Sequence, residues 1–183
     1  MITKGLLVTL TLATLLASPS LAQIDFSNFH SPAEVDAILE ELVDEHPTLA
    51  RLSTIGTSHE GRPIQVLKIS DNVHLDETDE DDVLFVAAHH AREWITVEMA
   101  LYLAEQLLVR YDTDPQLRAD IDNLEIWIVP IVNPDGVAYS WLPTGDRMWR
   151  KNRALNADGV DDRDDPDLEI VDVGAQLGIR VVT

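Results

Sequence analysis

The chain has 183 residues, with 33 acidic side chains against 13 lysines and arginines, which gives a formal net charge of −20. Nucleic acids and anionic membrane surfaces are polyanions that would repel such a protein, so the composition argues against both as partners. The chain contains no cysteine, which excludes disulfides and cysteine-ligated metal sites. Without its first 22 residues it would keep about 160, enough for one domain with a substantial core.

The first 22 residues have the features of a secretory signal peptide. Lys4 precedes an apolar segment, residues 5–17, and the small residues Ser20 and Ala22 form the kind of site at which such peptides are cleaved. A membrane anchor is the alternative, but the apolar segment is too short to span about 30 Å of hydrocarbon. We therefore expect a mature chain that starts near Gln23 and is secreted or periplasmic, without membrane association after cleavage.

A helix is predicted after residue 31. Ser31 followed by Pro32 and Glu34 is a helix-start pattern, because serine can cap, proline suits the first helical position and Glu34 can complete a capping box. The apolar residues that follow are spaced so that they share one helical face. Pro47 marks the end of the helix. The residues on that face are Val35, Ile38, Leu39, Leu42 and Val43.

Two strands are predicted next, over residues 49–56 and 64–70, with a turn between them at residues 57–63. Gly61 and Pro63 supply the turn chemistry. His59 and Glu60 lie in this turn, and we interpret them as solvated surface residues rather than ligands.

Residues 71–82 contain seven acidic side chains and no basic one. Like-charge repulsion holds such a run open in solvent, so we predict a solvated loop. A specific cation site is the alternative interpretation.

The remaining elements alternate between strands and helices, which predicts the α/β class with a mixed sheet flanked by helices. The continuous apolar character of the first of these strands is typical of a sheet covered by helices on both faces. We also expect the second strand to lack sheet partners and to leave an exposed apolar edge. The predicted elements are a strand at 83–88, a helix with Thr96 as its candidate cap that runs to Tyr111, a short helix opening at Asp114 and Pro115, a strand at 124–132 and a tight turn at 133–136.

His90 and Glu93 are the candidate metal ligands, because they follow a buried strand in what must be the turn out of it. Ligands bind beyond the carboxyl ends of strands in open α/β sheets, and an imidazole with a carboxylate suits Zn2+. His89 is the rival ligand, but strand alternation would turn it to the opposite face. By itself His-x-x-Glu is a common pattern and weak evidence for a metal site.

Residues 90–95, His-Ala-Arg-Glu-Trp-Ile, resemble the zinc-ligand motif of the zinc carboxypeptidases of the carboxypeptidase A/B type. Three further stretches resemble that family in the same order: residues 56–63, 130–136 and 147–153. The resemblance covers roughly residues 29–153. It implies a zinc carboxypeptidase-like fold and hydrolysis of a C-terminal peptide bond in a peptide or protein substrate by a zinc-activated water.

The resemblance also implies roles for individual residues. His90 and Glu93 would be the first two zinc ligands, and Arg92 would face the substrate-binding side. Arg150 matches the catalytic arginine of the family, which stabilises the oxyanion formed when water attacks the peptide carbonyl. Arg147 matches a residue at the edge of the substrate cleft.

The chain departs from the family pattern after residue 153. A family member supplies a second zinc-ligating histidine and a glutamate base well downstream, but no histidine follows His90 here. Residues 154–183 form an acidic, divergent tail that we expect to be disordered. A Ca2+ loop is the alternative, although the acidic spacing is not that of an EF-hand.

These observations divide the chain into a signal peptide at 1–22, the N-terminal part of a catalytic domain at 23–153 and the tail at 154–183. We expect a fragment of a secreted zinc carboxypeptidase that is inactive by itself, because two protein ligands bind zinc weakly. The alternative is a non-catalytic secreted binding module that retains half of the fold. A related branch that acts on peptidoglycan or on amidated peptides is a third hypothesis.

Overall fold

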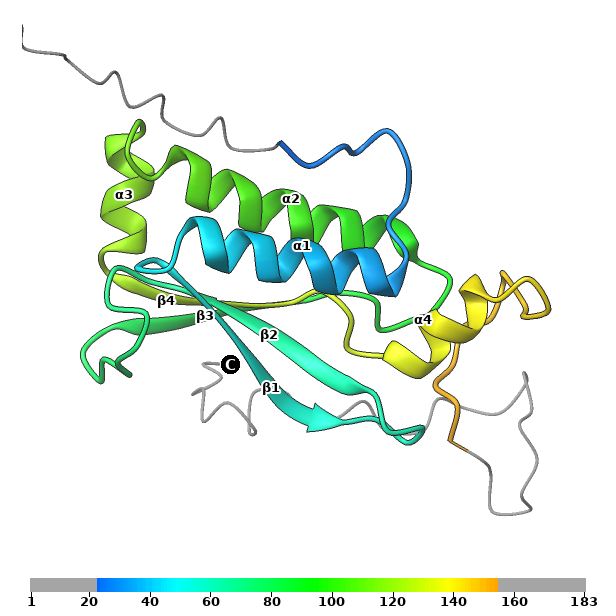
Figure 1. The fold of residues 1–183 in the computed structure, drawn as a ribbon. Coiled ribbons are helices and arrows are strands. Elements are labelled where there is room, and N and C mark those ends of the chain that lie inside the picture. Colours follow the sequence, from blue (N-terminus) through cyan, green and yellow to red (C-terminus); the bar gives the residue numbers. More distant parts are fainter. Residues whose placement is uncertain (1–22, 155–183) are drawn as a thin grey trace, which may run out of the picture.

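The computed structural model describes residues 23–154 (Figure 1). The predicted signal peptide and almost all of the predicted acidic tail lie outside these residues. Within residues 23–154, no helix combines the length and apolar character needed to cross a bilayer. The elements are α1 (Pro32–Glu45), β1 (Ala50–Thr57), β2 (Pro63–Ile69), β3 (Asp81–Val86), α2 (Trp94–Arg110), α3 (Pro115–Ile121), β4 (Leu124–Val129) and α4 (Pro134–Trp141).

The strands form one sheet in the order β1-β2-β4-β3. β1 pairs antiparallel with β2, β2 pairs antiparallel with β4, and β3 pairs parallel with β4. This arrangement confirms the prediction of an α/β fold with a mixed sheet. The prediction that residues 124–132 form an unpartnered edge is wrong, because β4 lies between β2 and β3. Among the described strands, β1 and β3 are the edges.

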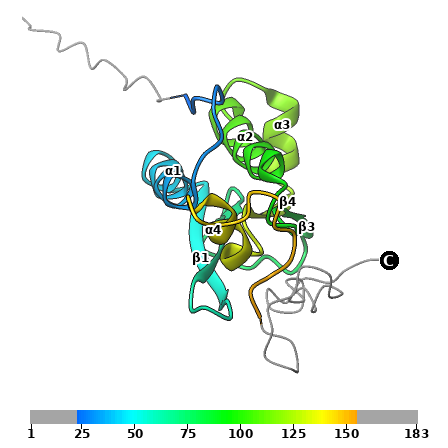
Figure 2. The same ribbon diagram turned by 90° about the vertical axis from the view of Figure 1, so that its right-hand side faces the viewer.

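The helices α1 and α2 lie side by side on one face of the sheet, and α3 packs at the end of α2 (Figures 1 and 2). Leu39, Leu101 and Ile128 are fully buried between these layers. The opposite face carries a second apolar cluster that includes Val66, Trp127 and Val129. Among the described residues, helices therefore cover one face of the sheet, not both as the apolar run at 83–88 had suggested.

Two of the predicted helix starts are confirmed, and one predicted helix start and one predicted turn are wrong. α1 starts as expected, and Glu34 Oε2 accepts hydrogen bonds from the Ser31 N–H and hydroxyl at 2.8 and 2.6 Å. α3 starts at Pro115, and Asp114 caps it. However, α2 starts at Trp94, two residues before Thr96. The predicted tight turn at 133–136 is instead the first turn of α4.

Lys68 of β2 is a buried charge, with 1% of its surface exposed. Its Nζ donates to Glu125 Oε1 of β4 at 2.6 Å and to the Leu75 carbonyl, and Asp76 Oδ1 lies 3.3 Å away. The same ammonium lies 4.9 Å from the centroid of the Trp127 ring. Lys68 therefore joins the centre of the sheet to the acidic segment between β2 and β3.

We expect Lys68→Met to lower the free energy of unfolding by about 3 kcal/mol, because it leaves the buried Glu125 carboxylate without its cation. Adding Glu125→Gln removes that charge and keeps an acceptor for the Glu77 amide, so most of the loss should be recovered. Urea unfolding of the three proteins measures both effects. Equal destabilisation by the single and double variants would contradict the explanation.

Candidate metal centre

The parallel pairing of β3 and β4 brings the carboxyl ends of both strands to the same edge of the sheet. Hydrogen bonds between the two segments continue beyond the strands. The Ala87 N–H donates to the Val129 carbonyl at 2.9 Å, and the Val132 N–H donates to the Ala87 carbonyl at 3.1 Å. The segment that follows β3 and the segment that follows β4 therefore start side by side. This is the edge at which a ligand site is expected in an α/β sheet.

Ala88 redirects the chain as it leaves β3. Its φ is +52°, the left-handed region, and it is the one non-glycine residue among those described with a positive φ. Its amide donates to the Thr96 hydroxyl at 2.9 Å, and that hydroxyl donates to the Glu93 carbonyl at 2.7 Å. Thr96 thus ties the turn together from inside α2, and does not cap the helix.

This turn also corrects the argument about His89. β3 ends at Val86, so His89 and His90 lie in the turn and not on the strand. The alternation of side chains between sheet faces does not apply to them. What distinguishes His90 is its direct contact with Glu93.

His90 and Glu93 converge at the start of α2. His90 Nδ1 lies 3.0 Å from Glu93 Oε1, with 27% and 42% of the two side chains exposed. Two donors bound about 2.0–2.1 Å from a tetrahedral zinc ion are roughly 3.3 Å apart, so a small opening of this pair would accommodate Zn2+. Within residues 23–154, no third histidine, cysteine or acidic side chain brings a ligand atom within 4.8 Å of both. The described residues therefore fit two positions of a zinc site.

The stretch with Arg147 and Arg150 runs beside the same turn. The Arg150 carbonyl accepts a hydrogen bond from the Ala91 N–H at 3.0 Å. Arg147 Nη1 donates to the Arg92 carbonyl at 3.1 Å. The structure therefore brings all the residues predicted for the site to one turn, and the Arg92 and Arg147 side chains are exposed there.

Arg147 is held by an aromatic stack. Its guanidinium carbon lies 3.3 Å from the centroid of the Trp94 ring, and Trp94 also stacks on Trp141 at 4.0 Å. The Trp94 indole N–H donates to Ser140 Oγ of α4 at 2.9 Å. Since Trp94 directly follows Glu93, this stack fixes the first residue of α2 against α4.

In the hairpin turn between β1 and β2, His59 and Glu60 are exposed, as predicted, but the turn is also bonded to α4. The buried Asp135 of α4 accepts hydrogen bonds from the Ser58 hydroxyl at 2.6 Å, the Glu60 amide at 2.8 Å and Arg62 Nη1 at 2.6 Å. Burial raises the pKa of Asp135, but these three donors outweigh it and hold the pKa below its ordinary value. Arg153 Nε lies 3.6 Å from Glu60 Oε1, which links the same turn to the Arg150 segment.

The sequence interpretation missed Asn133 and Asp135 as structural residues of the site. Asn133 caps α4 through Oδ1, which accepts from the Gly136 N–H at 3.1 Å. An asparagine directly before a proline is a recognised helix-start signal, so the cap could have been found from the sequence. The bonds of Asp135 to a hairpin far away in the chain leave no local signal.

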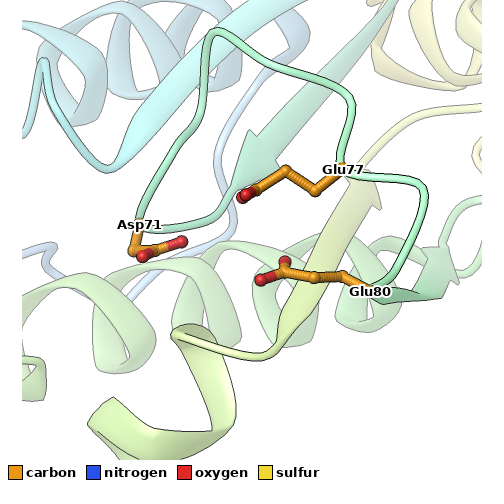
Figure 3. Close-up of side chains that lie close together, drawn as sticks. All are labelled: Asp71, Glu77 and Glu80. Atoms are coloured by element: carbon orange, nitrogen blue, oxygen red, sulfur yellow. The ribbon is translucent and has the colours of Figure 1, made fainter.

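The acidic segment between β2 and β3 brings three carboxylates together. Asp71, Glu77 and Glu80 point toward one another (Figure 3), with one oxygen of each within 4.8 Å of the others. Each has a buried oxygen without a hydrogen-bond partner among the described residues. The prediction of a fully solvated loop is therefore wrong for these three side chains. Nothing in the structure identifies an ion at this cluster, and we assign none to it.

A family model described as zinc carboxypeptidase matches residues 35–165. The chain belongs to the zinc carboxypeptidase family. It is similar to the zinc carboxypeptidase of Saccharothrix mutabilis subsp. capreolus, with 44% identity over 135 residues, and to mouse carboxypeptidase A2, with 36% identity over 130 residues. These matches cover 74% and 71% of this chain but only 31% and 30% of the relatives.

Solved structures agree with this membership. The fold is similar to that of the carboxypeptidase A from Helicoverpa armigera, with a TM-score of 0.65 and 36% identity over 75% of this chain and 32% of that one. It is also similar to thrombin-activatable fibrinolysis inhibitor, with a TM-score of 0.63 and 30% identity over 71% of this chain and 31% of that one. The zinc carboxypeptidase-like fold predicted from the motifs is confirmed. The chain spans about a third of the length of these relatives.

We expect Glu80→Gln to stabilise the protein at pH 7. Burial and the charges of Glu77 and Asp71 raise the pKa of Glu80, so the folded state holds its proton to a higher pH than the unfolded state. Stability is therefore lost as the pH rises from the pKa of Glu80 in the unfolded state to its higher pKa in the folded state. Above that range the ionised carboxylate destabilises the fold. The variant should gain on the order of 0.5 kcal/mol at pH 7, the scale of a released like-charge contact.

Thermal unfolding at pH 7 and at pH 4 checks this expectation, since the gain should be much smaller at pH 4, where Glu80 is largely protonated in both states. Glu41→Gln, at an exposed carboxylate of α1, is the matched control and should show no comparable gain. An equal gain from both variants would assign the effect to overall charge.

We expect Ala88→Gly to change the free energy of unfolding by less than about 0.5 kcal/mol, because relief of the left-handed conformation offsets both the added flexibility of glycine and the loss of the buried Ala88 methyl. Ala91→Gly is the control, since Ala91 is buried to the same degree but does not have a positive φ. There the loss should exceed about 1 kcal/mol. Urea midpoints compare the two, and equal losses would show that Ala88 is not strained.

Proposed function

We propose that residues 23–153 are the N-terminal part of the catalytic domain of a secreted zinc carboxypeptidase, which hydrolyses C-terminal peptide bonds in peptides or proteins. The observation that carries the proposal is the convergence of His90 Nδ1 and Glu93 Oε1 at 3.0 Å, at the carboxyl end of a parallel strand pair, in a member of this family. Secretion is proposed from residues 1–22, which have the composition of a signal peptide.

His90 and Glu93 would hold the metal. Bound Zn2+ supplies Lewis-acid chemistry and a water whose pKa is lowered toward about 7. Glu93 lies at the N-cap of α2, where the partial positive charge of the helix end favours a carboxylate. Both side chains are partly exposed, so they are accessible to a metal ion and to a substrate.

Arg150 is proposed to stabilise the oxyanion that forms when the substrate carbonyl is attacked. A guanidinium fixed near that oxygen acts on charge that appears only in the transition state. Its backbone bond to Ala91 supports the role, because it keeps Arg150 beside the turn that carries both ligands. Arg92 and Arg147 are proposed to line the substrate-binding side, where their side chains are exposed.

The 183-residue chain by itself is proposed to be inactive or nearly so. A catalytic zinc site normally takes three protein ligands, and the sequence has no histidine after His90. Two ligands hold zinc weakly, and the described residues place no carboxylate beside them that could serve as a general base. The relatives contain a further part of the domain that lies outside the matched third. Residues from that part would complete the site.

We expect the purified chain to bind Zn2+ weakly through His90 and Glu93, and to show no release of C-terminal amino acids from a blocked dipeptide. His90→Ala and Glu93→Gln should each weaken zinc binding at least about tenfold, since even changes outside the ligand set have that effect. Competition with a chromophoric chelator measures the affinity.

His89→Ala is the matched control, because it removes the neighbouring imidazole and leaves the contact of His90 with Glu93 intact. It should retain the affinity of the unchanged protein. Robust, chelator-sensitive peptidase activity of the pure chain would refute the proposed inactivity. The absence of any zinc binding would favour a non-catalytic binding module.

A further inference from the structure

Asn133 lies between the two segments that form the proposed active site. It directly precedes α4, and only 9% of its surface is exposed. Its side-chain Nδ2 donates to the His89 carbonyl at 3.1 Å and to the Lys151 carbonyl at 3.0 Å. Its Oδ1 accepts from the Gly136 N–H at 3.1 Å. One side chain therefore bonds to three separate parts of the backbone.

The two carbonyls that Asn133 holds belong to residues next to the proposed functional ones. His89 precedes the zinc ligand His90, and Lys151 follows Arg150. The Ala91 N–H to Arg150 carbonyl bond, at 3.0 Å, joins the same two segments directly. Asn133 and this backbone bond together set how far the zinc-ligand turn lies from the segment that carries the arginine.

An amide is the side chain that suits this position. It offers two N–H donors and a carbonyl acceptor in one plane, whereas a carboxylate has acceptors alone and a serine hydroxyl has one donor. The packing is close as well: a Cβ at Gly136 would lie 2.4 Å from the Lys151 carbonyl oxygen and 2.8 Å from both polar atoms of the Asn133 amide. Glycine at position 136 leaves room for the contact.

We propose that Asn133 is a positioning residue, which fixes His90 and Arg150 relative to each other through the carbonyls of His89 and Lys151. The inference rests on the proposed zinc site. A misplacement on the scale of 1 Å is costly for catalysis, and groups that orient metal ligands affect metal affinity about 10- to 100-fold. Asn133 connects α4 to the site through its side-chain hydrogen bonds, although no side chain of that helix is assigned to zinc or substrate.

Asn133→Asp separates this role from simple helix capping. Aspartate is nearly the same size and an equally good N-cap, so it can still accept from the Gly136 N–H. It has no donor for the carbonyls of His89 and Lys151, and its charge repels them. We expect the variant to weaken zinc binding by the chain about tenfold and to accelerate hydrogen exchange of the Ala91 amide, measured by NMR.

Ser58→Ala is the matched control. It removes a hydrogen bond to Asp135, also in the first turn of α4, and touches neither His89 nor Lys151. It should lower thermal stability and leave both zinc affinity and Ala91 exchange at the values of the unchanged protein. If Asn133→Asp fails to fold, Asn133→Ser takes its place, because serine also caps well but is too short to reach both carbonyls.

Unchanged zinc affinity and unchanged Ala91 exchange in the Asn133 variants would overturn the inference. Equal effects of Ser58→Ala and the Asn133 variants on both readouts would also overturn it, because the losses would then follow stability alone. If the unchanged protein binds no zinc, the proposed function fails, and Ala91 exchange still decides the inference. The inference is supported if the Ala91 amide exchanges faster in the Asn133 variants than in the unchanged protein and in Ser58→Ala.

Discussion

The parallel pairing of β3 with β4 is the constraint on which the rest of the site depends. Because Val83 faces Ile126 and Val86 faces Val129 in register, both strands end at the same level of the sheet. The segments that follow β3 and β4 are then joined by backbone hydrogen bonds, so they lie side by side whatever their side chains are. Sites at such edges combine residues from two connections, which a single hairpin cannot do.

The turn at Ala88 and the start of α2 place two metal-competent donors, His90 and Glu93, at this edge. The left-handed residue turns the chain sharply, and Thr96 holds the turn through bonds at both of its ends. Glu93 becomes the N-cap of the helix and faces His90. A strained residue beside a candidate site is consistent with the tendency of strain to persist where surrounding structure enforces it.

Local patterns predicted the elements of the fold, and failed where the partner lay far away in the chain. The start of α1 was predictable because Ser31 and Glu34 contact each other within one turn. The spacing of His90 and Glu93 was informative for the same reason. The bonding of the hairpin turn to α4 was missed because its partner, Asp135, is distant in sequence. The bridging bonds of Asn133 were likewise invisible, although its capping role had a local signature.

Charge alone would not make this protein selective for zinc. A chain with a net charge of −20 attracts any divalent cation, and carboxylate oxygens such as those of Asp71, Glu77 and Glu80 suit hard ions at least as well. The imidazole of His90 differs, because nitrogen donors favour zinc over calcium and magnesium. Its distance from Arg150 then decides whether a bound ion and a guanidinium could act on the same carbonyl. That distance depends on neutral hydrogen bonds between backbone carbonyls and an asparagine amide, which salt screens far less than it screens exposed charge pairs.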